Sequence, residues 1–227
     1  IKELVRDPLG AVFAILLPLF LLFIFRQFDI PNEAYLPENF TPGIIVFAFS
    51  FLTLFESTLV SRDRTTALMT RLSVSPMKRA EYVLGYLLST LPIALLQCLL
   101  ITAAGVALGL PMRARVLLAI PAALPAAVLF ALFGVFIGNI VSDKAAPGVS
   151  SVIVQLVCFT SGMYFPKELV GKGFAAVCDL LPFGACLNLI RAAVSGGDVF
   201  PAADAAVLAA WLAATLAAAA LLRKKSI

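Results

Sequence analysis

Long runs of apolar residues, nearly free of charge, constrain this chain more than any other feature. A helix that crosses the hydrocarbon core of a bilayer needs about 20 mostly apolar residues, and lipid excludes backbone whose polar groups are unpaired. The runs therefore predict an all-α polytopic membrane protein, with residues 1–227 forming a single transmembrane domain. We expect six spans, at about residues 9–25, 43–60, 82–108, 116–141, 147–165 and 205–222.

The composition excludes a sizeable soluble domain. Of the 227 residues, 62% are hydrophobic and 13% are charged, whereas soluble domains are about 45–50% apolar and about 25% charged. No room is left for a nucleotide-hydrolysing domain, and the phosphate-binding pattern G-x-x-x-x-G-K-[ST] does not occur. The chain has no histidine, which is the commonest general base and metal ligand. We therefore expect no catalytic residue, no metal site and no cofactor bound by this chain.

Charge predicts how the chain is oriented in the membrane. Six spans put both termini on one side, and that side holds 11 of the 17 lysines and arginines. Because cytoplasmic loops carry the excess of basic residues, we expect both termini in the cytoplasm and the protein in the plasma (inner) membrane. The net charge of +4 then reflects orientation and contact with membrane lipid, and we expect no nucleic-acid partner. Since the chain begins at Ile1 instead of Met, we expect a further segment before it.

The inner loop 61–81 holds five basic residues and is the sharpest local feature. Residues 65–72 can form a short helix with Leu68, Met69 and Leu72 on one side, which Ser75-Pro76 would end. Such a helix could lie on anionic headgroups. Alternatively, its apolar stripe with arginine at the rim could dock into a groove of a cytoplasmic partner.

The outer segment 166–201 is apolar in places but interrupted by proline and glycine. Its pieces at 174–181 and 185–194 are too short to cross, so we expect short re-entrant or interfacial helices packed against protein. A disulfide between Cys178 and Cys186 is open, although spacing alone does not establish one. The two halves of the chain show no inverted repeat, which disfavours the secondary transporters that are built from repeats.

Glu56 is the one acid that lies clearly inside an expected span. One interpretation is that it reaches the interface, or pairs with Arg62 or Arg64 about one to two turns away. The other is a role in a substrate path or in a dimer contact.

Aromatic residues crowd two of the expected spans. Phe47, Phe51 and Phe55 share one helical face. A second set, near the outer end of the fifth span, is Phe159, Met163, Tyr164 and Phe165. These side chains could pack or face lipid, with an aromatic belt at the interface. They could instead form the apolar lining and the outer gate of a path for a hydrophobic substrate.

Several short motifs, taken in order, resemble those of ABC transporter type-2 permeases. That family carries R-x-x-G-T-L-x-R-L-x-x-S-P-x-x-R between its second and third spans; here Arg64, 67–72 and 75–79 correspond to it, with Ala67-Leu68 in place of Gly-Thr. The stretch 161–166, Ser-Gly-Met-Tyr-Phe-Pro, resembles the family's S-G-x-x-x-P. The segment 181–196 and the opening 2–8, together with Pro18, also resemble the family, so the resemblance covers nearly the whole chain.

The resemblance implies a partnership and a mechanism. Two such permeases, identical or homologous, would pair above two cytoplasmic ABC ATPase subunits that bind ATP and Mg. The segment 65–79 would be the coupling helix that the ATPases push. The coupling residues would be Arg64, Leu68, Met69, Arg71, Leu72, Ser75, Pro76, Lys78 and Arg79. Substrates of this family are mostly exported drugs, lipids, antibiotics and polysaccharides, so we expect a hydrophobic or amphiphilic substrate.

Two alternatives remain at this point. The chain could be a channel or secondary transporter that needs no ATPase, or a membrane anchor for a cytoplasmic enzyme. The basic inner loop, the missing repeat and the scarcity of intramembrane charge favour the ABC permease, although an anchor would also account for the loop.

Overall fold

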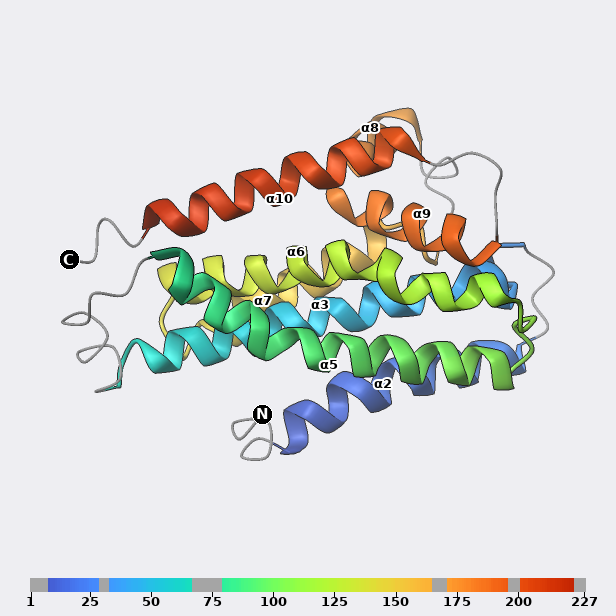
Figure 1. Cartoon of the computed structure of the whole chain (residues 1–227), viewed down its shortest axis with the longest axis horizontal. Helices are drawn as coiled ribbons and strands as arrows, with labels where there is room; N and C mark the ends of the chain where they lie inside the picture. Colours follow the sequence, from blue (N-terminus) through green and yellow to red (C-terminus); the bar gives the residue numbers. More distant parts are fainter. Residues whose placement is uncertain (1–7, 29–32, 67–78, 165–170, 196–200, 223–227) are drawn as a thin grey trace.

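The computed structural model describes residues 8–28, 33–66, 79–164, 171–195 and 201–222, and these contain helices and no strand. The α-helices are α2 (Pro8–Gln27), α3 (Pro37–Asp63), α5 (Arg79–Ala107), α6 (Ala119–Ile140), α7 (Ala146–Thr160), α8 (Lys172–Leu180), α9 (Pro182–Ser195) and α10 (Ala202–Leu222). Two short 3-10 helices, η1 (Glu33–Tyr35) and η2 (Ala114–Leu118), precede α3 and α6. The predicted all-helical fold class is therefore confirmed (Figure 1).

In the described part of the chain, four helices are long and apolar enough to cross a membrane, or five if a bent pair counts as one span. The four coincide with the expected spans at 43–60, 82–108, 116–141 and 205–222. The other two expected spans coincide with apolar helices that are shorter as described, at 14–27 and 146–160. The architecture is that of a membrane-embedded helical bundle, while the number of six spans stays a prediction.

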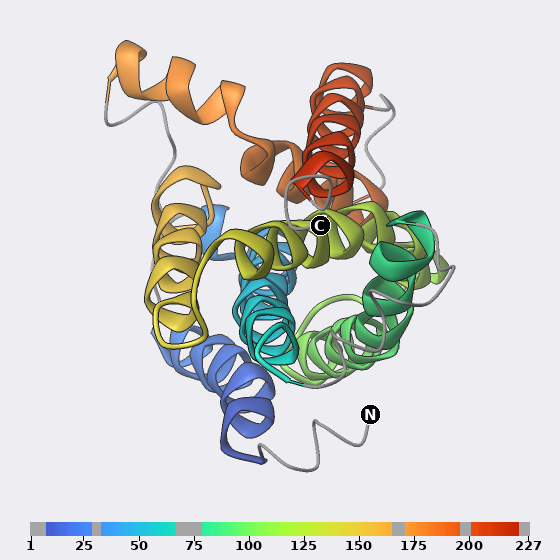
Figure 2. The ribbon, with the colours of Figure 1, turned by 90° about the vertical axis from the view of Figure 1, so that its left-hand side faces the viewer.

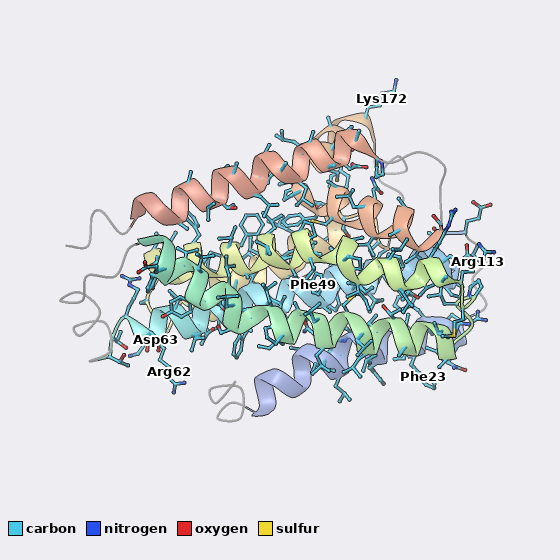
Figure 3. The ribbon with its side chains drawn as sticks, viewed as in Figure 1. Phe23, Phe49, Arg62, Asp63, Arg113 and Lys172 are labelled. Carbon is cyan, nitrogen blue, oxygen red and sulfur yellow. The ribbon has the colours of Figure 1, made fainter. Side chains whose placement is uncertain are left out.

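Successive long helices run in opposite directions, so that α3, α6 and α10 point one way and α2, α5 and α7 the other (Figure 1). The end of α3, the start of α5 and the end of α10 lie together at one end of the bundle, which we call the terminal end, and α2 runs away from that end. The labelled residues Arg62 and Asp63 mark this end, and Arg113 and Lys172 mark the opposite end (Figure 3). The expectation that both termini lie on one side of the membrane stays a prediction, because residues 1–7 and 223–227 lie outside the described residues.

α3 is the central helix, and it contacts α2, α5, α6, α7 and α9 (Figure 2). Every residue from 40 to 50 is buried, and Phe49 lies in the middle of the bundle (Figure 3). A helix that is apolar nearly all round has no side that needs water, so burial on every side suits its sequence. By contrast, Leu84 and Leu88 of α5 and Phe23 of α2 are more than half exposed and face outward. Such side chains suit contact with lipid.

Two glycines allow α6 to approach α3 closely. A Cβ atom on Gly134 would lie 2.5 Å from the Cβ of Glu56, and one on Gly138 would lie 2.6 Å from the Cβ of Val60. Both contacts are far shorter than van der Waals separation, so any larger residue would push the helices apart. Small residues four apart are a recurrent means of packing membrane helices. The halves of α3 and α6 nearest the terminal end are therefore held nearly backbone to backbone.

The outer segment contains a bent helix pair. α8 and α9 meet at an angle of 78°, in the part of the chain where two short helices were expected. Leu181 has an extended backbone because it precedes Pro182, and this ends α8 and opens α9. The Trp211 indole donates a hydrogen bond to the Leu180 carbonyl at 2.9 Å and so fixes the bend against α10. The geometry fits a re-entrant loop or a broken span.

The cysteines do not bridge this segment. Cys178 and Cys186 are both buried, and they form no disulfide with each other. The disulfide that the sequence left open is therefore absent.

Candidate functional site

Most of the proposed coupling residues lie outside the described residues. These are Leu68, Met69, Arg71, Leu72, Ser75, Pro76 and Lys78. Arg64 lies just beyond the end of α3 and is exposed, and Arg79 is the first residue of α5. The coupling helix itself thus stays a prediction, and the structure informs only its two flanks.

Polar contacts join three helix ends at these flanks. Arg64 donates from Nη1 to the carbonyls of Gly138 (2.9 Å) and Val141 (3.3 Å), which caps the end of α6. Free carbonyls at a helix C-terminus attract a cation, so this placement is favourable. The Tyr86 hydroxyl donates to Asp63 Oδ2 at 2.8 Å and joins α5 to α3. A displacement of the loop between α3 and α5 would therefore be transmitted to α6 as well.

Glu56 lies about two turns further into the bundle and is completely buried. The Thr90 hydroxyl of α5 contacts both Glu56 Oε2 and the Tyr86 carbonyl, the latter at 3.1 Å. The other carboxyl oxygen, Oε1, has no hydrogen-bond partner among the described residues. Glu56 neither reaches the interface nor pairs with Arg62 or Arg64, contrary to the first interpretation of the sequence. The carboxyl is an internal polar group between α3, α5 and α6.

Further polar contacts surround α3 at the same depth. The Thr53 hydroxyl donates to the Phe130 carbonyl of α6 at 2.7 Å. The Ser57 and Ser150 hydroxyls lie 2.6 Å apart and connect α3 to α7. With Thr90, these contacts tie α3 to α5, α6 and α7 in the half of the bundle nearest the terminal end.

The aromatic face of α3 is buried inside the chain instead of lining an open surface. Phe47 is 5% exposed and meets Phe51 edge to face at 5.2 Å between ring centroids, while Phe51 and Phe55 are half-buried. These contacts fit the packing interpretation. A path along this face would require the neighbouring helices to move.

The expected outer residues divide into different environments. Phe159 is 61% exposed, whereas Met163 is fully buried, close against Gly43 at the start of the α3 core. Tyr164 joins an aromatic cluster with Phe25, Tyr35 and Phe40, and its carbonyl accepts a hydrogen bond from the Tyr35 hydroxyl at 2.9 Å. Phe165 lies outside the described residues. The cluster closes the opposite end of the bundle between α2, η1 and α3.

The structure adds residues that the sequence did not single out. Tyr86 and Thr90 hold the polar contacts of α5, and Gly134 and Gly138 set the approach of α6. The glycine spacing inside an uncharged span was a readable signal for close helix packing. The roles of Tyr86 and Thr90 were not readable, because they depend on which residues of α3 stand opposite.

Among the described residues, no group of three or more Cys, Asp or Glu side chains lies close enough together to hold a metal ion.

Comparison with known proteins assigns the chain to a family. The family model described as "ABC-2 type transporter" matches residues 1–194, which include α2 to α9 up to Val194. Comparison with curated proteins and with solved structures gave no match. The matched region includes the inner loop, the central helix and the bent pair, and the resemblance inferred from the motifs is confirmed. The chain belongs to the ABC-2 type transporter family.

Proposed function

We propose that this chain is the membrane-spanning permease subunit of an ATP-driven exporter, and that it moves a hydrophobic or amphiphilic substrate outward. The observation that carries the proposal is the family match, which extends over residues 1–194 of a bundle of apolar helices. A separate cytoplasmic ABC ATPase, with its ATP and Mg, would supply the energy. A second permease, identical or homologous, would complete the translocation unit.

The proposed docking point for the ATPase is the inner loop at the terminal end. Its flanks are joined to α3, α5 and α6 by Asp63, Tyr86 and Arg64. A push on the loop would therefore reach three helices of the bundle at once. This connection supports the proposed coupling segment at 65–79, and it favours a cytoplasmic orientation for the terminal end, in keeping with the basic residues there.

The proposed substrate class follows from the apolar character of the central helices. α6 and α7 carry no charged residue between 119 and 140 or between 146 and 160. An ion path would need charged or convergent polar groups along it. A hydrophobic or amphiphilic molecule, passing along the aromatic face of α3 when the neighbouring helices part, fits these surfaces better.

The first experiment is purification of the tagged native protein in a mild detergent, followed by mass spectrometry of the chains that accompany it. We expect a stoichiometric soluble chain with a G-x-x-x-x-G-K-[ST] loop, and a second permease if the unit is a heterodimer. A known ABC exporter, purified in parallel, shows that the conditions preserve such complexes. Recovery of this chain alone under those conditions would contradict the proposal and favour a channel, a carrier or an anchor that needs no ATPase.

A further inference from the structure

The burial of Glu56 bears on whether its carboxyl carries a proton, and this point does not depend on the proposed function. Its side chain has no exposed surface, and Oε1 has no hydrogen-bond partner among the described residues. A buried carboxylate is costly unless a counter-charge or several donors compensate it. Whether Glu56 is ionised therefore depends on the hydrogen-bond donors and the charges that lie near its carboxyl.

Thr90 is the one donor among the described residues that reaches Glu56. Its hydroxyl lies in contact with Glu56 Oε2 and also at 3.1 Å from the Tyr86 carbonyl oxygen, one turn earlier in α5. A hydroxyl has one hydrogen to donate, and an ionised carboxylate and a carbonyl are both acceptors only. An ionised Glu56 would therefore compete with the Tyr86 carbonyl for that hydrogen. If Oε2 itself carries a hydrogen, Glu56 donates to Thr90, and Thr90 donates to the Tyr86 carbonyl.

The charges near Glu56 do not favour the ionised form. On α3, the next acid towards the terminal end is Asp63, which has the same sign. Arg64 is bound to the carbonyls at the end of α6. The exposed Arg62 lies in the last turn of α3, almost two turns from Glu56. From α5, the ionisable residues on this half are Arg79, Glu81, Tyr82 and Tyr86, and Arg79 opens the helix about three turns before Thr90.

The other helices packed on α3 bring no positive charge to this depth. α6 and α7 have no charged residue within their bounds, and the thiol of Cys158 lies near the far end of α7. The arginines of α2 and α9, Arg26 and Arg191, bond to the carbonyls of Leu108 and Asn39 at the opposite end of the bundle.

We propose that Glu56 is a proton-binding site in the core of the bundle: its carboxyl is neutral at neutral pH and donates to Thr90. This goes beyond the permease function, and it assigns a ligand, the proton, to a residue inside the membrane span. The hydrogen-bonded chain from Glu56 through Thr90 to the Tyr86 carbonyl then clamps α3 to α5.

Loss of this proton would place an uncompensated charge in the core of the bundle. On ionisation the carboxyl O–H bond breaks, its electron pair stays on the carboxylate, and the proton passes to a water molecule. Thr90 would then donate to the carboxylate and no longer to the Tyr86 carbonyl. Because a buried carboxylate is costly, ionisation would favour hydration of the site and loosen the contact between α3 and α5.

Infrared spectroscopy of the full chain in lipid tests the protonation directly, with any co-purifying subunits retained. At neutral pH we expect the wild-type protein to show the carbonyl band of a neutral carboxyl, and Glu56→Gln to lose that band. Glu33→Gln, which changes an exposed acid, is the matched control and leaves the band unchanged. Thr90→Val keeps the shape but removes the acceptor, so the band should move to the higher frequency of a carboxyl that donates no hydrogen bond. Identical spectra for the wild type and Glu56→Gln in this region would overturn the proposal.

Hydrogen exchange of the α5 amides at 83–94 tests whether ionisation loosens the contact between α3 and α5. On going from neutral to alkaline buffer, the exchange corrected for its intrinsic pH dependence should rise in the wild type and stay constant in Glu56→Gln. An equal rise in both proteins would overturn the clamp. Both measurements need neither an ATPase nor a transport assay, so their failure would leave the proposed permease function untouched, and failure of the purification experiment would leave these results standing.

Discussion

Glycine at two positions, and not a large apolar contact, decides how closely the central helices pack. Beside Gly134, the Thr53 carbonyl and the Glu56 Cβ leave no space for a methyl group, and Gly138 meets Val60 and the Ser57 carbonyl in the same way. In membranes, where lipid is as apolar as the helix surface, such close approach supplies much of the packing energy. The hydrogen bond from Thr53 to the Phe130 carbonyl of α6 forms at this level because the two backbones are close.

Gly134→Ala should destabilise the protein. The added Cβ would lie 2.5 Å from the Glu56 Cβ and 2.9 Å from the Thr53 carbonyl, and overpacking of this kind costs about 1–3 kcal/mol. The matched control is Gly85→Ala in α5, where nothing lies within 4 Å of the new methyl group. Since alanine is the better helix former, this control should be neutral or more stable by up to about 1 kcal/mol. Thermal unfolding in detergent measures both, and equal midpoints would contradict the close packing of α3 and α6.

Phe51→Ala tests the aromatic face as part of a substrate path. Phe51 is half-buried and packs edge to face on Phe47, so a ligand that passes between α3 and its neighbours would meet this ring. We expect a changed preference among apolar substrates in a vesicle transport assay. Leu88→Ala, at an outward-facing position of α5 that is 66% exposed, is the control and should leave the preference unchanged. An unchanged profile for Phe51→Ala across several substrates would assign the ring to packing alone.

At the scale of elements, the ends of α3, α5 and α6 behave as one unit. Arg64 caps α6 from beyond the end of α3, while Tyr86 and Asp63 join α5 to α3. The loop 67–78 therefore begins and ends on helices that are already connected. The bent pair α8–α9 forms a second unit at the opposite end, where Trp211 and the stacked rings of Phe130 and Phe183 hold it against α10 and α6.

Arg71→Glu, or deletion of residues 75–79, should abolish ATP-driven transport while membrane insertion stays normal. Arg71→Glu reverses the charge at the rim of the proposed docking helix, and the deletion removes the residues that connect this helix to α5. Arg113→Glu is the matched charge reversal at an exposed position of the opposite end, and it should retain transport. Transport in reconstituted vesicles, with insertion checked by membrane fractionation, measures the effect. Full transport by the Arg71→Glu and deletion variants would refute the docking assignment.

The whole molecule is a bundle with two chemically different ends, and its antiparallel helices bring together segments far apart in the chain (Figure 1). The terminal end holds Arg62, Arg64 and Lys144, and the opposite end holds the aromatic cluster and the bent pair. Over the whole sequence, the side expected to hold the termini and the loop 61–81 carries 11 of the 17 basic residues, and this excess predicts that the terminal end is cytoplasmic.

Single cysteines placed at both ends should report this orientation. The four native cysteines are buried or half-buried, so the wild-type protein serves as the unlabelled background. We expect a cysteine at Arg113 or Lys172 to react with an impermeant thiol reagent in intact cells. A cysteine at Arg62 or Lys144 should react only in inside-out vesicles. The reverse pattern would invert the topology and remove the basis for ATPase docking at the terminal end.

The amino-acid sequence by itself determined the helical class, the positions of most apolar helices and the family, because these depend on local hydropathy and on motifs contiguous in the chain. Residues 43–60 and 82–108 were readable as spans for this reason, and so were the two short helices around Pro182. The tertiary structure alone decided the partner of Glu56: the sequence offered Arg62 or Arg64, which are near in the chain, but Thr90 of α5 stands opposite. That pairing depends on the register of the antiparallel helices α3 and α5, and the register is decided by how α5 packs on both α3 and α6. Hydropathy, which sums over single residues, carries no information about it.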